Sequence, residues 1–126
     1  MATLEGFETT LKEVVNAKRL SASKVKELTE LALKLMEHDT QLVSILYRTH
    51  KSSSGTAKIN SLYVFDALAR AARHQVNKYK PDVHAIVGNC ATFLVKVEGV
   101  LEGLIQDVVS SGHPEAKVSF RDLFTY

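Results

Sequence analysis

The stretch that decides the fold is SLYVFDALARAARHQ, residues 61–75. When it is placed on a helix with about 3.6 residues per turn, its apolar side chains occupy two adjoining sides. The first side continues past the quoted stretch and comprises Leu62, Phe65, Ala69, Ala72, Val76 and Tyr79, and the second comprises Val64, Leu68 and Ala71. A helix with two apolar sides has to be covered on both. We therefore expect this helix to lie in the middle of a stack of helices.

The remaining side of the helix is polar and carries a carboxylate, Asp66, four residues before Arg70. Tyr63 and Arg73 share this side at helical spacing. In one interpretation, Asp66 and Arg70 form an ion pair on a solvated face, worth about 0.3–0.5 kcal/mol. In the other, this is a recognition face: Tyr63 offers a flat wall, Asp66 accepts a hydrogen bond from a ligand hydroxyl, and Arg70 binds a carbonyl or phosphate group. Both interpretations turn Asp66 away from the core.

The rest of the chain has the pattern of further helices joined by short links. Apolar residues recur at spacings of three and four, and no run of strict period-two alternation is present. The caps, glycines and prolines predict helices at 4–15, from Ser21 or Ser23 to 37, from a Thr40 cap to a loop at 51–58, at 58–79, from about 90 to 111, and from near 115 to 126, with a short helix or turn at 82–87. The predicted fold class is all-α, in one domain of residues 1–126.

Composition excludes several classes of function. The chain has 126 residues and a formal net charge of +2, so its overall charge does not point to nucleic acid. A single cysteine, Cys90, allows no disulfide framework within one chain. The five histidines are scattered without metal-ligand spacing, and we expect them at the surface. Because no catalytic set of residues is found either, we expect a protein that is not an enzyme and needs no metal or cofactor.

The start of the chain bears on location. MATLEGFETT, residues 1–10, lacks the basic and then apolar pattern of a signal peptide. No apolar run approaches the roughly 18 residues that a membrane-spanning helix needs. These features favour the cytosol or the nucleus.

The start of the predicted second helix is unusually basic. AKRLSASKVKE, residues 17–27, places Lys24 and Lys26 in the first two turns, where cations oppose the helix dipole at a cost of roughly a few tenths of a kcal/mol. Free backbone N–H groups, serine hydroxyls and lysines together would form an anion pocket. The alternative is a serine cap with lysines that extend into solvent, and both remain open.

The central helix resembles that of a known family. KINSLYVFDALARAARHQ is similar to the fourth helix of the RNA polymerase II carboxy-terminal-domain (CTD) interaction domains, or CIDs, especially those of SR-related CTD-associated factors and fungal termination factors. That helix commonly reads Leu-Tyr-x-x-Asp-Ser-Ile-x-Arg. Leu62, Tyr63, Asp66 and Arg70 match it, whereas Ala67 replaces the serine.

A second segment resembles the same family in the right order. LSASKVKEL, residues 20–28, is similar to the Ile-Ser-x-Ser/Ala-Lys/Arg-Ile opening of the family's second helix. The resemblance covers residues 4–80 well and the remainder loosely. It implies a right-handed superhelical stack of about seven to eight helices, similar to VHS and ENTH domains.

The resemblance also implies a function. A nuclear protein of this kind binds the phosphorylated heptad tail of RNA polymerase II, Tyr-Ser-Pro-Thr-Ser-Pro-Ser, and couples transcription to RNA 3′-end processing or termination. By this resemblance, the peptide-binding residues are Tyr63, Asp66 and Arg70, and Asp66 accepts a hydrogen bond from the heptad tyrosine. Ser21 and Lys24 bind a phosphate at the fifth heptad position, and Arg121 binds one at the second position.

The C-terminal end departs from the family pattern. The seventh helix of the family usually leads to a tryptophan and an eighth helix, whereas KVSFRDLFTY, residues 117–126, has no tryptophan. We expect a C-terminal helix that is shortened or missing, and an exposed apolar patch where it would pack. A partner chain, such as a second copy in a homodimer, or altered packing would cover that patch.

Three other functions remain open. The domain could be a CID-like structural subunit that binds no phosphopeptide. It could be a VHS- or ENTH-like trafficking adaptor at a membrane, although residues 1–10 contain two glutamates and no lysine or arginine. Direct RNA binding is the third, and the net charge of +2 argues against it as the main role.

Overall fold

Five α-helices and one short 3₁₀ helix make up the computed structural model, which describes residues 2–53 and 55–110. They are α1 (Leu4–Asn16), α2 (Ala22–Lys34), η1 (Met36–His38), α3 (Asp39–Ser52), α4 (Thr56–Tyr79) and α5 (Cys90–Ser110). The described residues contain no strand, which confirms the all-α class. The helix that the sequence predicts from near 115 lies outside them.

Several predicted boundaries shift by a few residues. Ser21, not Ser23, caps α2, and α2 ends before the predicted 37 because η1 follows it. The prediction that Thr40 caps the third helix is wrong, since α3 already begins at Asp39, whose Oδ1 accepts the Thr40 N–H at 2.8 Å. The loop at 51–58 is shorter than predicted, because α3 continues to Ser52 and α4 starts at Thr56.

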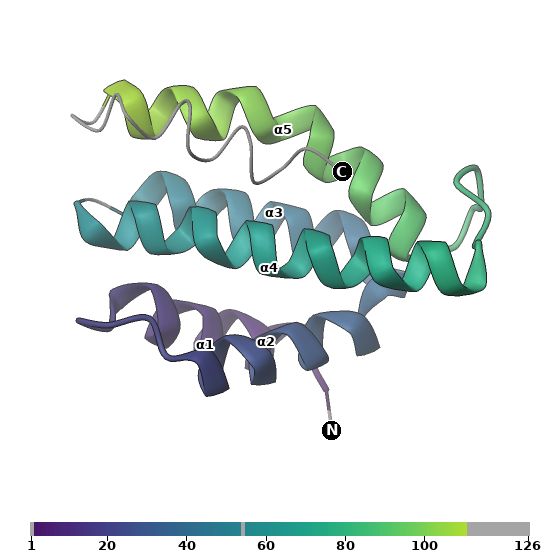
Figure 1. Ribbon diagram of the computed structural model, residues 1–126, viewed down its shortest axis with the longest axis horizontal. Coiled ribbons are helices and arrows are strands. Elements are labelled where there is room, and N and C mark those ends of the chain that lie inside the picture. Colours follow the sequence, from purple (N-terminus) through teal and green to yellow (C-terminus); the bar gives the residue numbers. More distant parts are fainter. Residues whose placement is uncertain (1, 54, 111–126) are drawn as a thin grey trace.

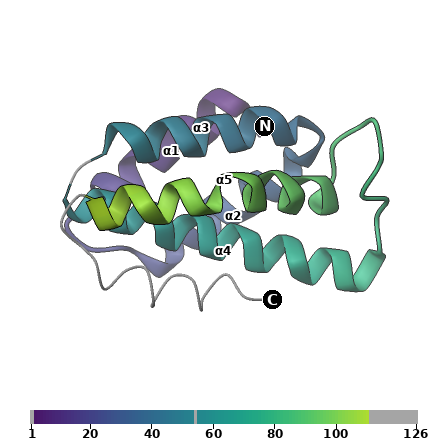
Figure 2. The same cartoon turned by 90° about the horizontal axis from the view of Figure 1, so that it is seen from above.

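The helices form three layers, with α3 and α4 side by side in the middle (Figure 1). The pair α1 and α2 covers one face of this layer and α5 covers the other. Seen from above, α5 runs between α3 and α4 (Figure 2), in contact with both. Since α4 contacts every other α-helix of the described chain, its predicted central position is confirmed.

The core is built from the apolar sides that periodicity assigned. Along α4 the fully or almost fully buried apolar residues are Leu62, Val64, Phe65, Leu68, Ala69 and Ala72. Phe7 and Leu11 of α1, Leu46 of α3 and Phe93 of α5 join them in one cluster. Burial of such side chains contributes about 1.5–3 kcal/mol each, which makes this cluster the main source of stability.

A buried polar cluster joins α3, α4 and α5 at the end where the loop between α3 and α4 lies. The Lys58 ammonium donates to the Asp107 carboxylate and to the His50 carbonyl oxygen, the latter at 3.3 Å. Lys51 Nζ lies 3.3 Å from the other Asp107 oxygen, and His50 Nε2 lies 3.2 Å from Asp107 Oδ2. His50 is 0% exposed, so the expectation that all histidines lie at the surface is wrong for it.

The connection from α4 to α5 is fixed by specific contacts. Lys80 ends α4 in the left-handed conformation, with φ of 47°, and Pro81 follows it. The Asn89 side chain accepts the N–H groups of Ala91 and Thr92 at 2.8 and 3.1 Å and thereby caps α5. Gly88 packs so closely on the start of α3 that a Cβ there would lie 2.5 Å from Asp39 Oδ1.

No helix among the described residues is both long enough and apolar enough to cross a membrane.

Gly99 and Gly103 of α5 are exposed, and a Cβ at either would meet nothing within 4 Å. They therefore mediate no close helix contact in the described part of the chain.

Candidate peptide-binding site

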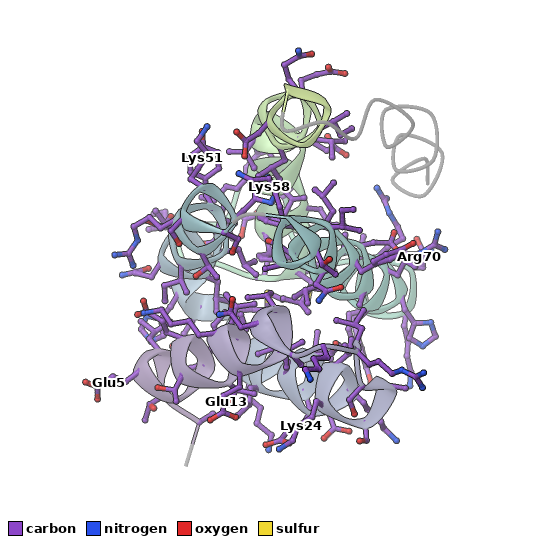
Figure 3. All side chains as sticks on the ribbon, turned by 90° about the vertical axis from the view of Figure 1, so that its left-hand side faces the viewer. Glu5, Glu13, Lys24, Lys51, Lys58 and Arg70 are labelled. Atoms are coloured by element: carbon purple, nitrogen blue, oxygen red, sulfur yellow. The ribbon has the colours of Figure 1, made fainter. Side chains whose placement is uncertain are left out.

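The outer side of α4 presents the residues that the sequence singled out. Tyr63 is 42% exposed, and the Arg70 side chain is 52% exposed. Arg70 Nε lies 3.0 and 2.9 Å from the two oxygens of Asp66, so the predicted pair between residues four apart is formed. In Figure 3, Arg70 extends away from the helix stack.

The expectation that Asp66 lies on an open outer face is wrong. Asp66 is 9% exposed as a residue and its side chain 12%, which places it at the boundary between the core and the surface. Arg70 contributes to this shielding because its guanidinium lies against both carboxylate oxygens. A helical wheel gives the direction of a side chain but not how far its neighbours cover it.

The geometry leaves Asp66 able to accept another hydrogen bond. Arg70 Nε carries one N–H, which is shared between the two oxygens, whereas an ionised carboxylate offers about four acceptor positions. A charge-assisted bond to a hydroxyl at the carboxylate edge would be stronger than a neutral one. The exposed ring of Tyr63, one turn earlier on α4, is placed to contact the group that carries this hydroxyl.

The second part of the predicted site is the start of α2. Ser21 Oγ accepts the Lys24 N–H at 3.4 Å and lies 3.1 Å from Ser23 Oγ. The first turn of α2 contains no acidic residue, so its positive dipole end is not compensated there. Lys24 Nζ lies 3.5 Å from Glu27 Oε2, and both side chains are more than half exposed. Such a pair contributes little, so the ammonium can exchange it for an anion.

A cavity of about 170 Å³ lies beside this helix start, between α1 and α2. Ser21 and Lys24 line it together with Glu13, Val14 and Ala17. Glu13 is exposed, and its carboxylate would disfavour an anion on its side of the cavity, so a phosphate would bind on the side of Ser21 and Lys24.

The two parts of the predicted site lie on separate elements. Figure 3 shows Lys24 at the lower edge of the stack and Arg70 on α4 at its side. The first turns of α4 are tied to the end of α1 and the link that follows it, because Asn60 Nδ2 donates to the carbonyl oxygens of Val15 and Ala17 at 3.1 and 3.5 Å. A ligand that contacts both parts has to be extended. Arg121, the third predicted phosphate contact, lies outside the described residues.

Other features of the described chain are separate from this site. A cavity of about 470 Å³ between α3 and α5 includes Val43, Tyr47 and Lys96 and none of the predicted site residues. No group of three or more histidine, cysteine or acidic side chains in the described residues could hold a metal ion. Burial raises the pKa of the Cys90 thiol, which makes it a poor nucleophile. Sequence reasoning missed Asn60. A buried amide at the start of a helix gives no local signal in the sequence.

The model of the CID domain family matches residues 5–125. The chain belongs to this family. The CTD-interacting domain (CID) of Seb1 from S. pombe superposes with a TM-score of 0.79 at 20% identity, over 97% of this chain and 95% of that one. The CID of yeast Nrd1 in complex with Sen1 NIM3 gives a TM-score of 0.82 at 23% identity, over 96% of this chain and 84% of that one.

A further structure, that of the RNA polymerase II CTD-interacting domain of Nrd1, matches with a TM-score of 0.79 at 23% identity, over 96% of this CID and 81% of that chain. At these identities the superpositions establish the fold. The resemblance of the α2 and α4 segments to CIDs is confirmed by the family match, which covers both.

Proposed function

We propose that this CID binds the phosphorylated heptad-repeat tail of RNA polymerase II, and that it couples transcription to RNA 3′-end processing or termination in the nucleus. The observation that carries the proposal is the constellation on α4, where Arg70 holds the carboxylate of Asp66 beside the exposed ring of Tyr63. Membership of the CID family supports it, as does the likeness in fold to the RNA polymerase II CTD-interacting domain of Nrd1.

Each of the three α4 residues has a distinct role in the proposal. Asp66 accepts a hydrogen bond from the hydroxyl of the heptad tyrosine, an interaction with a charged acceptor worth about 1.5–3 kcal/mol. Arg70 fixes the carboxylate and contacts the peptide backbone or a phosphate through the exposed part of its guanidinium. Tyr63 packs against the aromatic ring or a proline of the peptide.

Phosphate is bound away from the tyrosine, at the start of α2. Ser21 and Lys24 contact a phosphate at the fifth heptad position, where the uncompensated helix dipole adds to the attraction. Arg121 contacts a phosphate at the second position. The binding role and membership of the CID family both support assigning this domain to interaction modules rather than enzymes.

We also propose three finer features that the resemblance to CIDs implies. These are one domain over residues 1–126, a right-handed superhelix of seven to eight helices like those of VHS and ENTH domains, and a homodimer through an apolar C-terminal surface. An experimental structure of the chain tests the first two. Sedimentation at several protein concentrations tests the third, with a mass that stays at 13.9 kDa as the contradicting result.

A peptide titration tests the function directly. Fluorescence anisotropy with labelled tail peptides, either unphosphorylated or phosphorylated at the second, fifth or seventh position, should show the tightest binding for one phospho-form. Failure of every peptide to bind below millimolar concentration, with a folded protein, would leave the structural role without phosphopeptide binding as the better hypothesis.

Two substitutions separate the roles of α4 and α2. Asp66→Asn should weaken every peptide by about 10-fold to 100-fold, because all of them carry the tyrosine. Lys24→Ala should weaken only the form phosphorylated at the fifth position, and less so at high salt. Lys34→Ala is the matched control, since Lys34 is an exposed lysine in the last turn of α2 and does not line the cavity. Equal effects of Lys24→Ala on all peptides would contradict the phosphate role.

A further inference from the structure

The exposed large apolar residues of the described chain gather where α4 meets α5. Besides Tyr63 there are five of them, which we call the α4–α5 patch: Tyr79, Val83, Ile86, Val87 and Val95. Ile86 is fully exposed and Tyr79 and Val87 about two thirds exposed. Single exposed apolar residues are common, but five within 17 residues of sequence are typical of a binding surface.

A small cavity adjoins this patch, and Val83 and Val95 belong to both. It has a volume of about 220 Å³ and lies between the second half of α4 and the first half of α5. Val76, Pro81 and Val83 form one wall, and Leu94 and Val95 form the other. The volume is below the 300–1,000 Å³ usual for small-molecule sites, so it suits one inserted side chain rather than a cofactor.

The apolar turn is held in place before any ligand arrives. Asp82 Oδ1 accepts the His84 N–H at 2.9 Å, and Asn89 Nδ2 donates to the Asp82 carbonyl oxygen at 2.8 Å. Gly88 is packed against Asp39 on the far side of the turn. Ile86 is therefore presented to solvent by a fixed turn, which lowers the entropy cost of binding through it.

The surroundings of the patch favour an anionic ligand. Arg73 lines the cavity, and Lys78 and Lys80 lie beside Tyr79, with Lys78 Nζ 5.2 Å from the centre of that ring. The carboxylates nearby are those of Asp82, which is engaged by the turn, and Glu98. A partner with apolar side chains and negative charges is complementary to this surface. A second copy of the chain is not, because its own cations would face these.

The cavity lies farther along the same helix as the proposed tyrosine site. Arg73 follows Arg70 by three residues on α4 and also lines the cavity. From Asp66 to Val76 the helix rises about 15 Å at roughly 1.5 Å per residue. A seven-residue repeat in extended form spans up to about 23–25 Å. A repeat that follows one bound at Asp66 can therefore reach the cavity.

We propose that the α4–α5 patch and its cavity bind a neighbouring repeat of the same phosphorylated tail. A tyrosine or proline of that repeat enters the cavity, and a phosphate lies near Arg73, Lys78 and Lys80. This inference rests on the proposed function. It adds a second contact point, so that the protein reads two repeats at once and gains affinity through effective concentration.

The test compares phosphopeptides of one and two repeats, each phosphorylated at the fifth position, in isothermal titration calorimetry. Wild-type protein should bind the two-repeat peptide about 10-fold more tightly than the one-repeat peptide, with one protein per peptide. The double substitution Ile86→Ser with Val87→Ser should reduce this gain to the roughly twofold statistical effect and leave one-repeat binding unchanged. Val95→Ser, on α5, should act in the same direction and does not alter the turn.

Controls separate the outcomes. Asp66→Asn should weaken both peptides by a similar factor and keep the gain. A two-repeat peptide with alanine in place of tyrosine and the prolines of one repeat should bind like the one-repeat peptide. A gain of only about twofold in wild type, a gain that the patch substitutions do not reduce, or two proteins bound per peptide would overturn the inference while leaving the proposed function standing. Absence of one-repeat binding would refute both.

Discussion

His50 predicts a pH dependence of stability whose size follows from its surroundings. The side chain is 0% exposed and touches the charged cluster of Lys58 and Asp107. Burial, aided by the positive charge of Lys58, lowers the pKa of His50 from 6.5 to about 4, while Asp107 and the Leu104 backbone act in the opposite direction. His50 is therefore neutral in the folded protein at neutral pH.

The sign follows from where the proton binds more tightly. Because the folded pKa of His50 is lowered, the unfolded chain takes up the proton first as pH falls through 6.5, and the free energy of unfolding falls with it. At about 1.36 kcal/mol per pKa unit, the loss is about 2 kcal/mol by pH ~5 and about 3 kcal/mol by pH ~4. Burial raises the pKa values of Asp39 and Asp107, but their lysine partners and hydrogen bonds outweigh it and the net shift is downward from 3.8. The stability that these two carboxylates contribute is therefore lost only at pH below this window.

Urea unfolding of wild type and His50→Gln at pH ~7.5 and ~5 measures this contribution. The difference in unfolding free energy between the two proteins should change by about 2 kcal/mol between these pH values, in the direction that favours the variant at low pH. His74→Gln, at an exposed histidine of α4, should cause no such change. A difference that is constant with pH would refute the reasoning. An NMR titration of wild type supplies an independent check, and a His50 pKa above 6 would contradict it.

Two further pairs of substitutions test the packing. Gly88→Ala should destabilise the protein by about 1–3 kcal/mol in thermal unfolding, because its Cβ would clash with Asp39. Gly99→Ala should instead stabilise the protein by up to about 1 kcal/mol, since that helical site is open. Unchanged stability of Gly88→Ala would contradict the packing. Lys58→Met should cost about 2–3 kcal/mol, because a partly buried carboxylate loses its buried cation. Lys51→Met, at a half-exposed lysine, should cost at most about 1 kcal/mol. Equal losses for the two lysines, measured by denaturant unfolding, would argue against the buried cluster.

The sequence predicted the central helix correctly because helical periodicity records which sides are covered. The apolar sides of α4, at Leu62, Phe65 and Leu68, are buried as the spacing required. The same periodicity placed Asp66, Tyr63 and Arg70 on one side, and that is where they lie. It could not give the burial of Asp66, which depends on the conformation of Arg70 and on the fit of neighbouring helices.

The sequence could not predict the contacts that join distant segments. Lys58 was assigned to the edge of a loop and His50 to the surface, but Asp107, 49 residues after Lys58, draws both into a buried cluster. The α4–α5 patch was not found either. A run such as Ile86–Val87 has the same local pattern whether a neighbouring helix covers it or solvent does.

Local spacing by itself determined the all-α class, the central helix and the α2 and α4 segments that match the CID family, because each is set by residues within a few turns of one another. Only the tertiary structure decided which polar groups are buried, how much of Asp66 is accessible, and which apolar side chains stay uncovered. Those properties depend on which helices pack together, and burial is a property of the packed chain rather than of any one segment.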